Sequence, residues 1–311
     1  MLAGESMEIR NLYENNDPSV VVLGAFDGLH RGHLSLLKAG KKLALKKQAK
    51  LAVMTFDEHP DIVLRDNPMK LLTTQKEKLD LLEKLGVEIV FMPRFRDIAG
   101  LSAECFFYQI LLGDFKAKGA VVGPNFRFGK KARGNSKLLN LLGQKEGLPV
   151  LVRPGVTQNG QIISSTLIRR LIRQGEVSRA NTLLGRRYSL TGTVIAGEGR
   201  GRKLGMPTAN LQIAPEKLLP PLGVYLVQGF WQNKSCYGLL SISDKPTFHA
   251  QSEIVSEVYF FDLNENLYGQ EITLECIKYL RGIVKYSNAN DLMDQVKKDE
   301  KEARNIIYFL A

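Results

Sequence analysis

The sequence predicts an N-terminal doubly wound α/β domain followed by a small β-barrel with a C-terminal helix. In the first part of the chain, short apolar runs alternate with stretches whose apolar residues recur every three or four positions. Continuous apolar strands between helices indicate a parallel sheet that is covered on both faces. In the second part, short strand patterns follow one another between Gly and Pro residues, which is typical of a small barrel.

Five strands are expected in the α/β domain, with four helices between them. The strands are VVVLG (20–24), LAVMTF (51–56), VEIVFM (87–92), GAVVG (119–123) and LPVLV (148–152). The helices are expected at 33–49, 74–86, 102–112 and 135–147. The strands of the barrel are expected at 189–197, 224–232, 236–243, 256–263 and 270–280, and its helix at about 290–307.

Charge differs between the two parts of the chain. Residues 1–186 hold 29 Lys and Arg against 18 Asp and Glu, whereas residues 187–311 hold 14 of each. We therefore expect one domain over 1–186, which carries the whole net charge of +11, and a second over 187–311. A basic domain suits polyanionic small molecules as well as nucleic acid, so local motifs must decide between them.

The composition excludes several classes of protein. A hydrophobic fraction of 44% with 24% charged residues is that of a globular chain, not of a disordered or collagen-like one. No run reaches the ~18 apolar residues of a membrane span, and residues 1–20 lack the apolar core of a secretion signal, so a cytoplasmic protein is expected. Three distant cysteines, Cys105, Cys236 and Cys276, favour packing roles over a disulfide framework or a zinc site.

The first chemical motif follows the first strand. In VVVLGAFDGLHRGH (20–33), a buried strand ends in a turn that contains Gly24 and Phe26 and leads to His30 and His33. Ligand sites of open parallel sheets lie at the carboxyl ends of the strands, where a helix N-terminus can receive phosphate. Two imidazoles three residues apart on a starting helix lie on one side and can donate hydrogen bonds to phosphate oxygens. A metal site is not expected, because this domain has only one other histidine.

The second motif is ISSTLIRRLIR (163–173), at the end of the same domain. Ser164, Ser165 and Thr166 can cap a helix N-terminus while exposed amides and hydroxyls meet an anion, and Arg169 adds positive charge behind them. A plain helix cap followed by a solvated basic face would show the same pattern. The pairing with the first motif favours an anion site.

The third motif, GEGRGRKLGMPTANL (197–211), opens the barrel domain. It contains four glycines and a basic neighbour that can form an anion-binding loop: Gly197, Gly199, Gly201, Gly205 and Arg202. Thr208 and Asn210 follow with neutral oxygens two residues apart. Such oxygens suit Mg²⁺ that keeps water and phosphate oxygens as its other ligands.

Together these motifs resemble those of a known family. GAFDGLHRGH and ISSTLIR resemble the two nucleotide-binding motifs of the nucleotidyltransferase superfamily, in the form found in bacterial bifunctional riboflavin kinase/FAD synthetases. GEGRGRKLGMPTAN is similar to the riboflavin kinase motif GxGxGRxLGxPTAN. GPNFRFG (123–129) resembles the flavin-adenylylating segment, and TFDEHP (55–60) a TFxPHP element. The resemblance covers nearly the whole chain.

The resemblance implies two reactions that consume ATP. In the riboflavin kinase barrel, riboflavin and ATP give FMN and ADP. In the Rossmann-like nucleotidyltransferase domain, FMN and ATP give FAD and pyrophosphate. The implied general base of the kinase is Glu257, in a strand SEVYFF (256–261) that precedes NLYGQ (266–270).

The resemblance also implies binding roles in the nucleotidyltransferase domain. The ATP site would comprise the turn, the two histidines and the second motif, that is Gly24, Phe26, His30, His33, Ser164, Ser165, Thr166 and Arg169. His30 and His33 would hold the α-phosphate and the leaving pyrophosphate. Asn125, Phe126 and Phe128 would contact FMN.

The sequence departs from the family pattern at four positions. Glu58 stands where proline is usual, and Leu34 stands where a Gln commonly follows the second histidine. In SISDKPTF (241–248), Ser243 replaces glycine and Lys245 replaces arginine. If that loop closes over flavin, the kinase is impaired, so an FAD synthetase without an effective kinase stays open as an alternative.

A regulator that binds flavin or nucleic acid without turnover is the other alternative. The net charge of +11 would suit nucleic acid, but the sequence has no RNA-recognition motif. The expected partners are therefore riboflavin, FMN and ATP, without a membrane or nucleic acid. The oligomeric state does not follow from the sequence.

Overall fold

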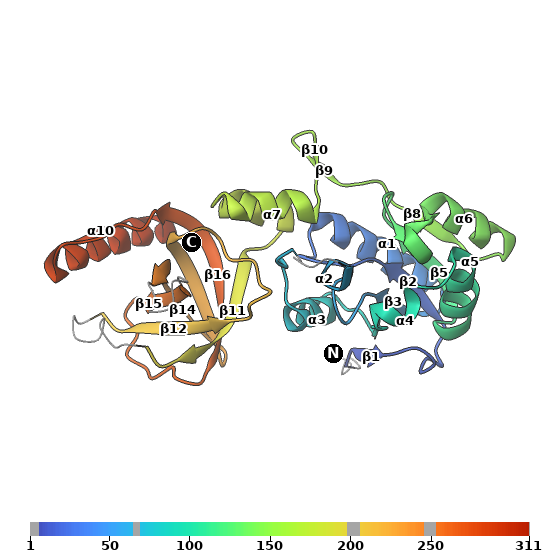
Figure 1. The fold of residues 1–311 in the computed structure, drawn as a ribbon, viewed down its shortest axis with the longest axis horizontal. Helices are drawn as coiled ribbons and strands as arrows, with labels where there is room; N and C mark the ends of the chain where they lie inside the picture. The colour runs from blue at the N-terminus through green and yellow to red at the C-terminus, as the bar shows by residue number, and fades with distance from the viewer. Residues whose placement is uncertain (1–5, 65–68, 198–205, 246–252, 311) are drawn as a thin grey trace. The chain divides into compact units, whose positions relative to one another are not determined.

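The protein consists of two compact units, Met1–Ser165 and Thr166–Ala311 (Figure 1). The structure is a computed structural model and describes residues 6–64, 69–197, 206–245 and 253–310. The first unit is an α/β domain and the second is a β-barrel with a terminal helix, as the sequence predicts.

A six-stranded parallel sheet forms the centre of the first unit. Its strand order is β1-β4-β3-β2-β5-β8, and every neighbouring pair is parallel. The strands are β1 (Glu8–Arg10), β2 (Ser19–Leu23), β3 (Lys50–Met54), β4 (Ile89–Phe91), β5 (Ala117–Val122) and β8 (Val150–Val152). The five apolar runs all form strands. β1 was not expected because it is a short edge strand with two exposed residues, and it therefore has no apolar run.

The helices of the first unit lie where the apolar spacing predicts them. The long ones are α1 (Arg31–Lys47), α3 (Gln75–Lys84) and α6 (Ser136–Lys145). The segment expected as a helix at 102–112 begins as α5 (Ala103–Cys105) and continues as a π-helix, η1 (Phe106–Asp114). The remaining short elements are α2 (Pro60–Leu64), α4 (Phe95–Ile98), β6 (Arg127–Phe128), η2 (Lys130–Ala132), β7 (Gly134–Asn135), β9 (Thr157–Gln158) and β10 (Gln161–Ile162).

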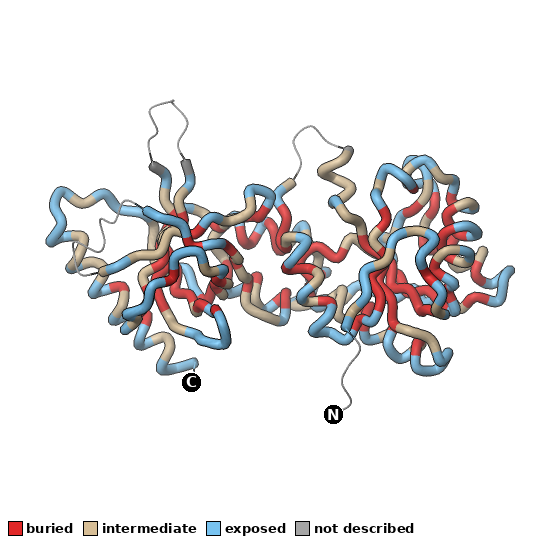
Figure 2. The backbone as a smooth tube through the Cα atoms, turned by 90° about the horizontal axis from the view of Figure 1, so that it is seen from below, coloured by how far each residue is buried: buried red, intermediate tan, exposed pale blue. Residues whose placement is uncertain are grey.

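Both faces of the parallel sheet are covered. Val20 and Val22 of β2 pack in a cluster with α1 and α3, whereas Val21 and Leu23 pack with η1 and α6. All four valine and leucine side chains are almost completely buried. Figure 2 shows the buried backbone concentrated in the interior of each unit. Alternate residues of one strand thus contribute to two cores, which explains why the strand is apolar throughout.

The order of the strands determines where a ligand site can form. From β2 the chain crosses to β3 and β4 on one side of the sheet, while β5 and β8 lie on the other side. β2 and β5 are therefore the neighbours between which the strand order reverses. In open α/β sheets, ligands bind beyond the carboxyl ends of the strands at such a point. The segments that follow β2 and β5 are GAFDGLHRGH and GPNFRFG.

A closed antiparallel barrel forms most of the second unit. Its strand order is β11-β12-β15-β14-β13-β16, and β16 pairs with β11 to close it. The strands are β11 (Tyr188–Ile195), β12 (Thr208–Ile213), β13 (Gly223–Trp231), β14 (Lys234–Lys245), β15 (Glu253–Phe260) and β16 (Glu271–Arg281). β12 was not among the expected strands, because the sequence TANLQI belongs to the motif that was interpreted only as a phosphate and metal site.

Helix α8 (Val177–Leu184) belongs to the barrel unit. The Ser178 hydroxyl donates to the carbonyl of Ile277 (3.1 Å), and the Asn181 amide donates to the carbonyl of Cys276 (2.8 Å). The side-chain amide oxygen of Asn181 also accepts a hydrogen bond from the main-chain N–H of Tyr188 (2.7 Å). These bonds join α8 to the barrel strands and agree with its place in the second unit.

The terminal helix α10 (Ala289–Tyr308) packs against the outside of the barrel. Ala303 of the helix lies in one cluster with Leu226 and Leu239 of the strands β13 and β14. At the end of β16, Arg281 donates to both oxygens of the buried Asp299 carboxylate, at 2.7 to 3.0 Å. This pairing raises the pKa of Arg281. An apolar contact and a charged pair therefore hold α10 in place.

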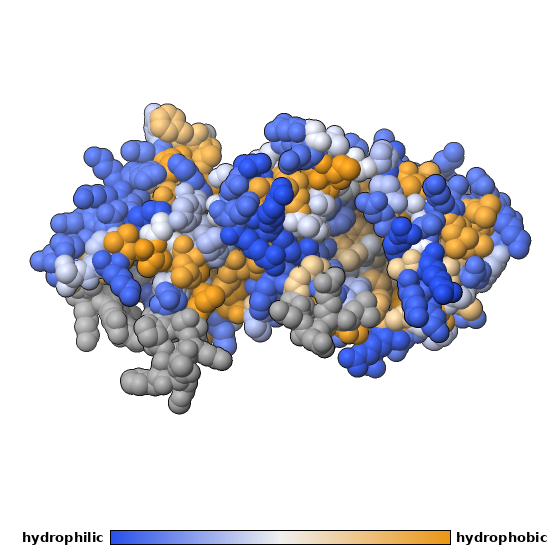
Figure 3. Space-filling view, turned by 45° about the horizontal axis from the view of Figure 1, so that its top comes forward, coloured by the Kyte–Doolittle hydropathy of each residue, from blue (hydrophilic) through white to orange (hydrophobic). Residues whose placement is uncertain are grey.

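The surface is mixed in character. On the face drawn in Figure 3, hydrophobic side chains form small groups between hydrophilic ones. Within the described ranges, we find no helix long and apolar enough to cross a membrane.

Candidate active sites

A strained turn joins β2 to α1 in the first unit. Phe26 and Leu29 adopt positive φ angles of 54° and 39°, which residues with a side chain rarely do. Gly28 lies between them with φ 82°, and a Cβ atom there would come within 2.7 Å of Leu72. Glycine is therefore required at this position. Backbone strain of this kind tends to be retained at functional sites.

The two histidines lie against each other at the start of α1. Their rings are stacked with centroids 3.7 Å apart, and the Phe26 ring lies 5.2 Å from that of His33. His30 is the N-cap residue, and its Nδ1 accepts a bond from the main-chain N–H of His33 (3.4 Å). In the neutral ring this leaves the proton on Nε2, which makes Nε2 a donor. The sequence interpretation that both imidazoles share one side of a helix start agrees with this geometry.

Asp27 connects the turn to two other segments. Its buried carboxylate accepts main-chain N–H bonds from Leu72 (2.9 Å) and Thr73 (3.0 Å), and a bond from the Thr73 hydroxyl (3.3 Å). The main-chain carbonyl of Asp27 accepts a bond from the Ser165 hydroxyl (2.8 Å). The structure thus brings the first residue of α7 (Ser165–Arg173), in the second motif, to the turn of the first motif.

The remaining residues of the second motif surround the start of α7. Ser164 immediately precedes the helix, and Thr166 is exposed in its first turn. Arg169 follows Ser165 by four positions, so the two side chains share one side of the helix. The Arg169 side chain is buried, which is uncommon for an arginine and requires partners.

The segment expected to contact flavin follows β5. Asn125 is exposed, and the ring of Phe126 stacks on that of Phe128 with centroids 5.6 Å apart. Phe128 is 6% exposed and also contacts Phe106 of η1 (5.4 Å). Phe128 is therefore part of the core, and Asn125 and Phe126 supply the accessible surface of this segment.

In the barrel, the strand register brings together three of the expected residues. Asn210 of β12 lies directly opposite Glu257 of β15, and Glu257 lies opposite Ser241 of β14. Directly opposite residues of antiparallel strands point to the same face, with Cβ atoms about 5 Å apart. Thr208 is two residues from Asn210 and shares this face.

That face is the outside of the barrel. Ser256 and Val258, the neighbours of Glu257 in β15, are buried in the interior, so Glu257 points outward. Leu239 and Tyr259 lie opposite each other on the same outer face and belong to the cluster that contacts α10. The carboxylate, the amide and the hydroxyl therefore lie on the side of the barrel on which α10 packs.

Asn210 also contacts the start of the Gly-rich segment. A Cβ atom on Gly197 would lie 2.0 Å from the amide nitrogen of Asn210. Any side chain at position 197 would displace Asn210 from its place beside Glu257. The other residues expected in this loop, Gly199, Gly201, Arg202 and Gly205, lie outside the described residues.

A small pocket of about 60 Å³ lies next to Thr208. Its walls include Pro207, Thr208 and residues 266–268 of the NLYGQ segment. The pocket therefore brings the end of the third motif and the NLYGQ segment together.

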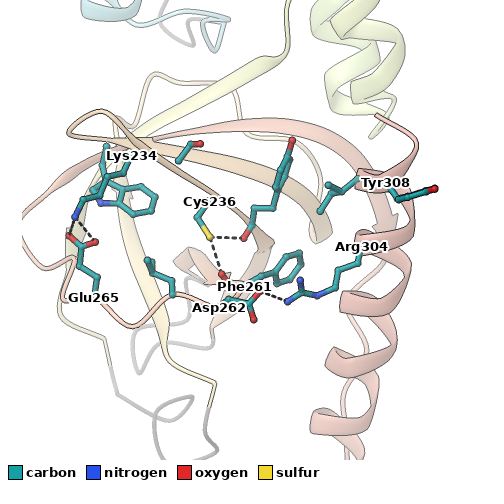
Figure 4. Close-up of a pocket in the computed structure, with 12 residues that line it drawn as sticks. Lys234, Cys236, Phe261, Asp262, Glu265, Arg304 and Tyr308 are labelled. Carbon is teal, nitrogen blue, oxygen red and sulfur yellow. Dashed lines mark hydrogen bonds and ion pairs between the residues drawn. The ribbon is translucent and has the colours of Figure 1, made fainter. Parts of the chain in front are cut away.

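A larger pocket of about 840 Å³ lies between β14, the loop after β15 and the end of α10 (Figure 4). Ion pairs at its edge join Lys234 to Glu265 (3.0 Å) and Arg304 to Asp262 (2.7 Å). The Cys236 thiol donates to the carbonyl of Phe261, and burial raises the pKa of this thiol. Phe261 is the last residue of the SEVYFF segment, but among the described residues none of the predicted site residues lines this pocket, and its cysteine stays protonated at neutral pH.

Two polar residues of the first unit were missed by the sequence analysis. Asp27 stands inside a quoted motif, and a carboxylate in an otherwise apolar turn was a signal for its role. Lys78 of α3 is buried, and its ammonium group donates to the Thr55 hydroxyl (3.0 Å) just beyond β3. No sequence signal distinguishes Lys78 from the exposed lysines of the same helix.

The fold defines a protein with a doubly wound α/β domain followed by a closed antiparallel barrel. Residues 12–167 match the FAD synthetase family, and residues 184–307 match the riboflavin kinase family. The Bacillus subtilis bifunctional riboflavin kinase/FMN adenylyltransferase is 37% identical over 302 residues, which are 95% of this chain and 94% of that protein. The Escherichia coli (strain K12) protein of the same name is 32% identical over 92% of this chain and 91% of its own. The chain belongs to the bifunctional riboflavin kinase/FMN adenylyltransferase family.

The resemblance that the motifs indicated is therefore confirmed, and both a kinase domain and an adenylyltransferase domain are present. The fold agrees with a crystal structure from Streptococcus pneumoniae that is described as a macrolide-efflux protein. It is 31% identical, with a TM-score of 0.88 over 96% of this chain and 99% of that one.

Proposed function

We propose that the barrel unit phosphorylates riboflavin to FMN and that the α/β unit adenylylates FMN to FAD, each at the residues described above. The observation that carries the proposal is the strand register, which places Asn210 and Glu257 side by side with Thr208 on one face. The turn after β2, with its stacked histidines and its bond to Ser165, is the corresponding observation in the other unit.

In the kinase reaction, the 5′-hydroxyl oxygen of riboflavin attacks the γ-phosphorus of ATP, and the bond from that phosphorus to the ADP oxygen breaks. The hydroxyl proton passes to a carboxylate oxygen of Glu257. A carboxylate on a rigid strand is suited to this role because its position is fixed relative to the neighbouring strands. Catalysis otherwise consists of alignment and charge stabilisation.

In the adenylyl transfer, a phosphate oxygen of FMN attacks the α-phosphorus of ATP, and pyrophosphate leaves. His30 and His33 donate hydrogen bonds to the α-phosphate and to the leaving group. Ser164, Ser165 and Thr166 bind the triphosphate at the N-terminus of α7, and Arg169 adds positive charge. Such donors act on charge that develops during the reaction. Asn125 and Phe126 contact the flavin.

Mg²⁺ fits the barrel site. The Thr208 hydroxyl and the Asn210 amide are neutral oxygen donors on one face, and a carboxylate stands beside them. Within the described ranges, no cluster of three or more His, Cys, Asp or Glu residues could hold a metal. This donor set suits a hard cation that keeps water and phosphate oxygens among its ligands. When bound, Mg²⁺ neutralises phosphate charge.

A chain with an effective adenylyltransferase and a weak kinase is the second candidate. Ser243, which stands where the family has glycine, lies two residues from Ser241 and therefore on the face of Glu257. A side chain there narrows the space beside the proposed base. Lys245, the other departure, is the last residue of β14.

Incubation with riboflavin, ATP and Mg²⁺, followed by chromatographic separation of FMN and FAD, tests both candidates. Formation of FMN and then FAD supports two working centres. FAD from supplied FMN without FMN from riboflavin would support the second candidate. If neither product forms, the chain is a binding protein and the proposal fails.

A further inference from the structure

Lys78 is a buried cation beside the adenylyltransferase turn. Its side chain is 8% exposed, whereas Lys76 and Lys84 of the same helix are exposed. Burial of an ammonium group is unfavourable unless hydrogen bonds and opposite charges compensate for lost hydration. A lysine buried in this way calls for a structural or functional explanation.

Hydrogen bonds connect Lys78 to the turn that follows β2. Its Nζ donates to the Thr55 hydroxyl oxygen (3.0 Å) and to the carbonyl of Phe56 (3.4 Å). The Thr55 hydroxyl in turn donates to the carbonyl of Ala25 (3.1 Å), in the turn itself. One hydroxyl therefore connects the buried ammonium group to the segment that leads from β2 to the histidines.

Two carboxylates act on the same cation. Asp27, in the turn, and Asp57, just beyond β3, both favour the charged form of Lys78. Asp27 is itself buried and ties the turn to Thr73 and Ser165. A positive charge beside this carboxylate offsets its negative charge within a site that must bind a triphosphate.

We propose that Lys78 is a positioning residue for adenylyl transfer, whose charged ammonium group holds the end of β3 against the turn and balances Asp27. The inference rests on the proposed adenylyltransferase function. Lys78 is not proposed to touch substrate, because its ammonium group donates to protein oxygens.

If the charge of Lys78 positions the turn, the rate of adenylyl transfer and the stability of the fold change with pH in opposite directions. Burial lowers the pKa of Lys78 from its ordinary value of 10.5 to about 8. Between these pH values the unfolded chain binds more protons than the folded chain, so a rise in pH through this window stabilises the fold. The same rise removes the charge that balances Asp27, so the rate of adenylyl transfer should fall. A merely structural lysine would not cause a loss of rate in a fold that becomes more stable.

The test compares FAD formation from supplied FMN between pH 6 and 10 in the full-length chain and its variants. We expect the wild-type rate to fall with a midpoint near pH 8, while kinase activity of the same chain lacks this decline. Lys78→Met should lower the rate roughly 10- to 100-fold at pH 7 and abolish the decline near pH 8. Lys78→Arg should retain most of the rate at pH 9, because a guanidinium stays charged.

Two further variants separate positioning from general damage. Lys84→Met removes an exposed lysine from the same helix and should leave both activities unchanged. Thr55→Val removes the connecting hydroxyl but keeps the cation, so the rate should fall while the decline near pH 8 remains. Thermal unfolding and kinase activity report whether each variant is folded.

A Lys78→Met variant with the wild-type rate of adenylyl transfer would overturn the inference. A pH profile of this rate that the substitution leaves unchanged would do the same. So would a loss of rate that matches the unfolded fraction at every pH. If the Lys78→Arg variant does not fold, the pH profiles of the wild type and of Lys78→Met still show whether the charge of Lys78 affects adenylyl transfer. Absence of FAD formation by the wild-type chain would instead contradict the proposed function.

Discussion

At the residue scale, contacts with their neighbours hold the two stacked histidines in place. His30 accepts a bond from the N–H of His33, and the His33 ring contacts the rings of both His30 and Phe26. Neither ring can rotate without disturbing the other. Donors that are already oriented require little reorganisation as charge develops at the α-phosphorus.

Replacing His30 or His33 with Ala should lower FAD formation from supplied FMN by about 10²- to 10³-fold, the usual effect of removing one oriented donor. FMN formation from riboflavin should persist because the kinase lies in the other unit. Separate assays of the two steps on one preparation measure this. An undiminished rate of adenylyl transfer in both variants would exclude the proposed role.

Glu257 owes its place to the register of β12, β15 and β14. Glu257→Gln keeps the size of the side chain but removes the charge that we propose accepts the hydroxyl proton. FMN formation should fall by about 10²- to 10⁴-fold, the usual contribution of general-base catalysis. The measurement is the initial rate of FMN formation at saturating riboflavin and ATP.

Glu271→Gln on β16 is a matched control, because this glutamate is exposed on the same barrel. Its kinase rate should equal that of the wild type. Thr208→Ala should weaken the use of Mg²⁺ and ATP, so added Mg²⁺ should partly restore it and should not restore Glu257→Gln. A full kinase rate in Glu257→Gln would place the base elsewhere.

At the scale of elements, a largely buried charged pair joins α10 to β16. Arg281 contacts both oxygens of Asp299, whose side chain is 5% exposed, and Gln295 donates a further bond to it (2.8 Å). Loss of one partner from such a pair leaves a buried charge without its counter-charge. The position of α10 over the outer face of the barrel should therefore be sensitive to Arg281.

Arg281→Met should lower the free energy of unfolding of the barrel unit by about 3 kcal/mol. Lys278 forms an exposed ion pair with Glu302 between β16 and α10. Lys278→Met should change the free energy of unfolding by less than ~1 kcal/mol. Urea unfolding followed by fluorescence of Trp231, the single tryptophan, reports on the barrel alone. Equal effects of the two substitutions would show that the buried pair does not secure the helix.

At the scale of the whole molecule, the proposed kinase residues lie in the second compact unit, whereas His30, His33 and Ser165 of the proposed adenylyltransferase site lie in the first. A fragment of residues 166–311 should make FMN from riboflavin and no FAD. A fragment of residues 187–311, as the charge distribution suggests, should also make FMN but be less stable. It lacks α8 and with it the bonds of Ser178 and Asn181 to β16, each worth about 1 kcal/mol.

Chromatographic product analysis and Trp231 fluorescence measure the two properties of the fragments. FAD from either fragment would refute the division of activities between the units. Equal stability of the two fragments would show that α8 does not contribute to the barrel.

Much of this architecture was predictable because it depends on local pattern. Apolar runs such as 20–24 and 119–123 mark strands buried on both faces, and the helical spacing at 33–49 marks α1. β1 and β12 were not predicted, since an edge strand and a strand inside a functional motif carry no continuous apolar run. The boundary near residue 186 that the charge counts favour stays a prediction: the compact units divide after Ser165, whereas the match to the riboflavin kinase family begins at residue 184.

The sequence by itself determined the two fold classes, the family and the segments that carry its motifs, because these depend on periodicity and on residues close together in the chain. Only the tertiary structure decided which distant groups meet. The pairing of Asn210 with Glu257 follows from strand register, and the bond from Ser165 to Asp27 joins segments more than a hundred positions apart. The burial of Lys78 beside Asp27 is likewise a result of packing, since burial depends on what surrounds a residue in space and not on its neighbours in the chain.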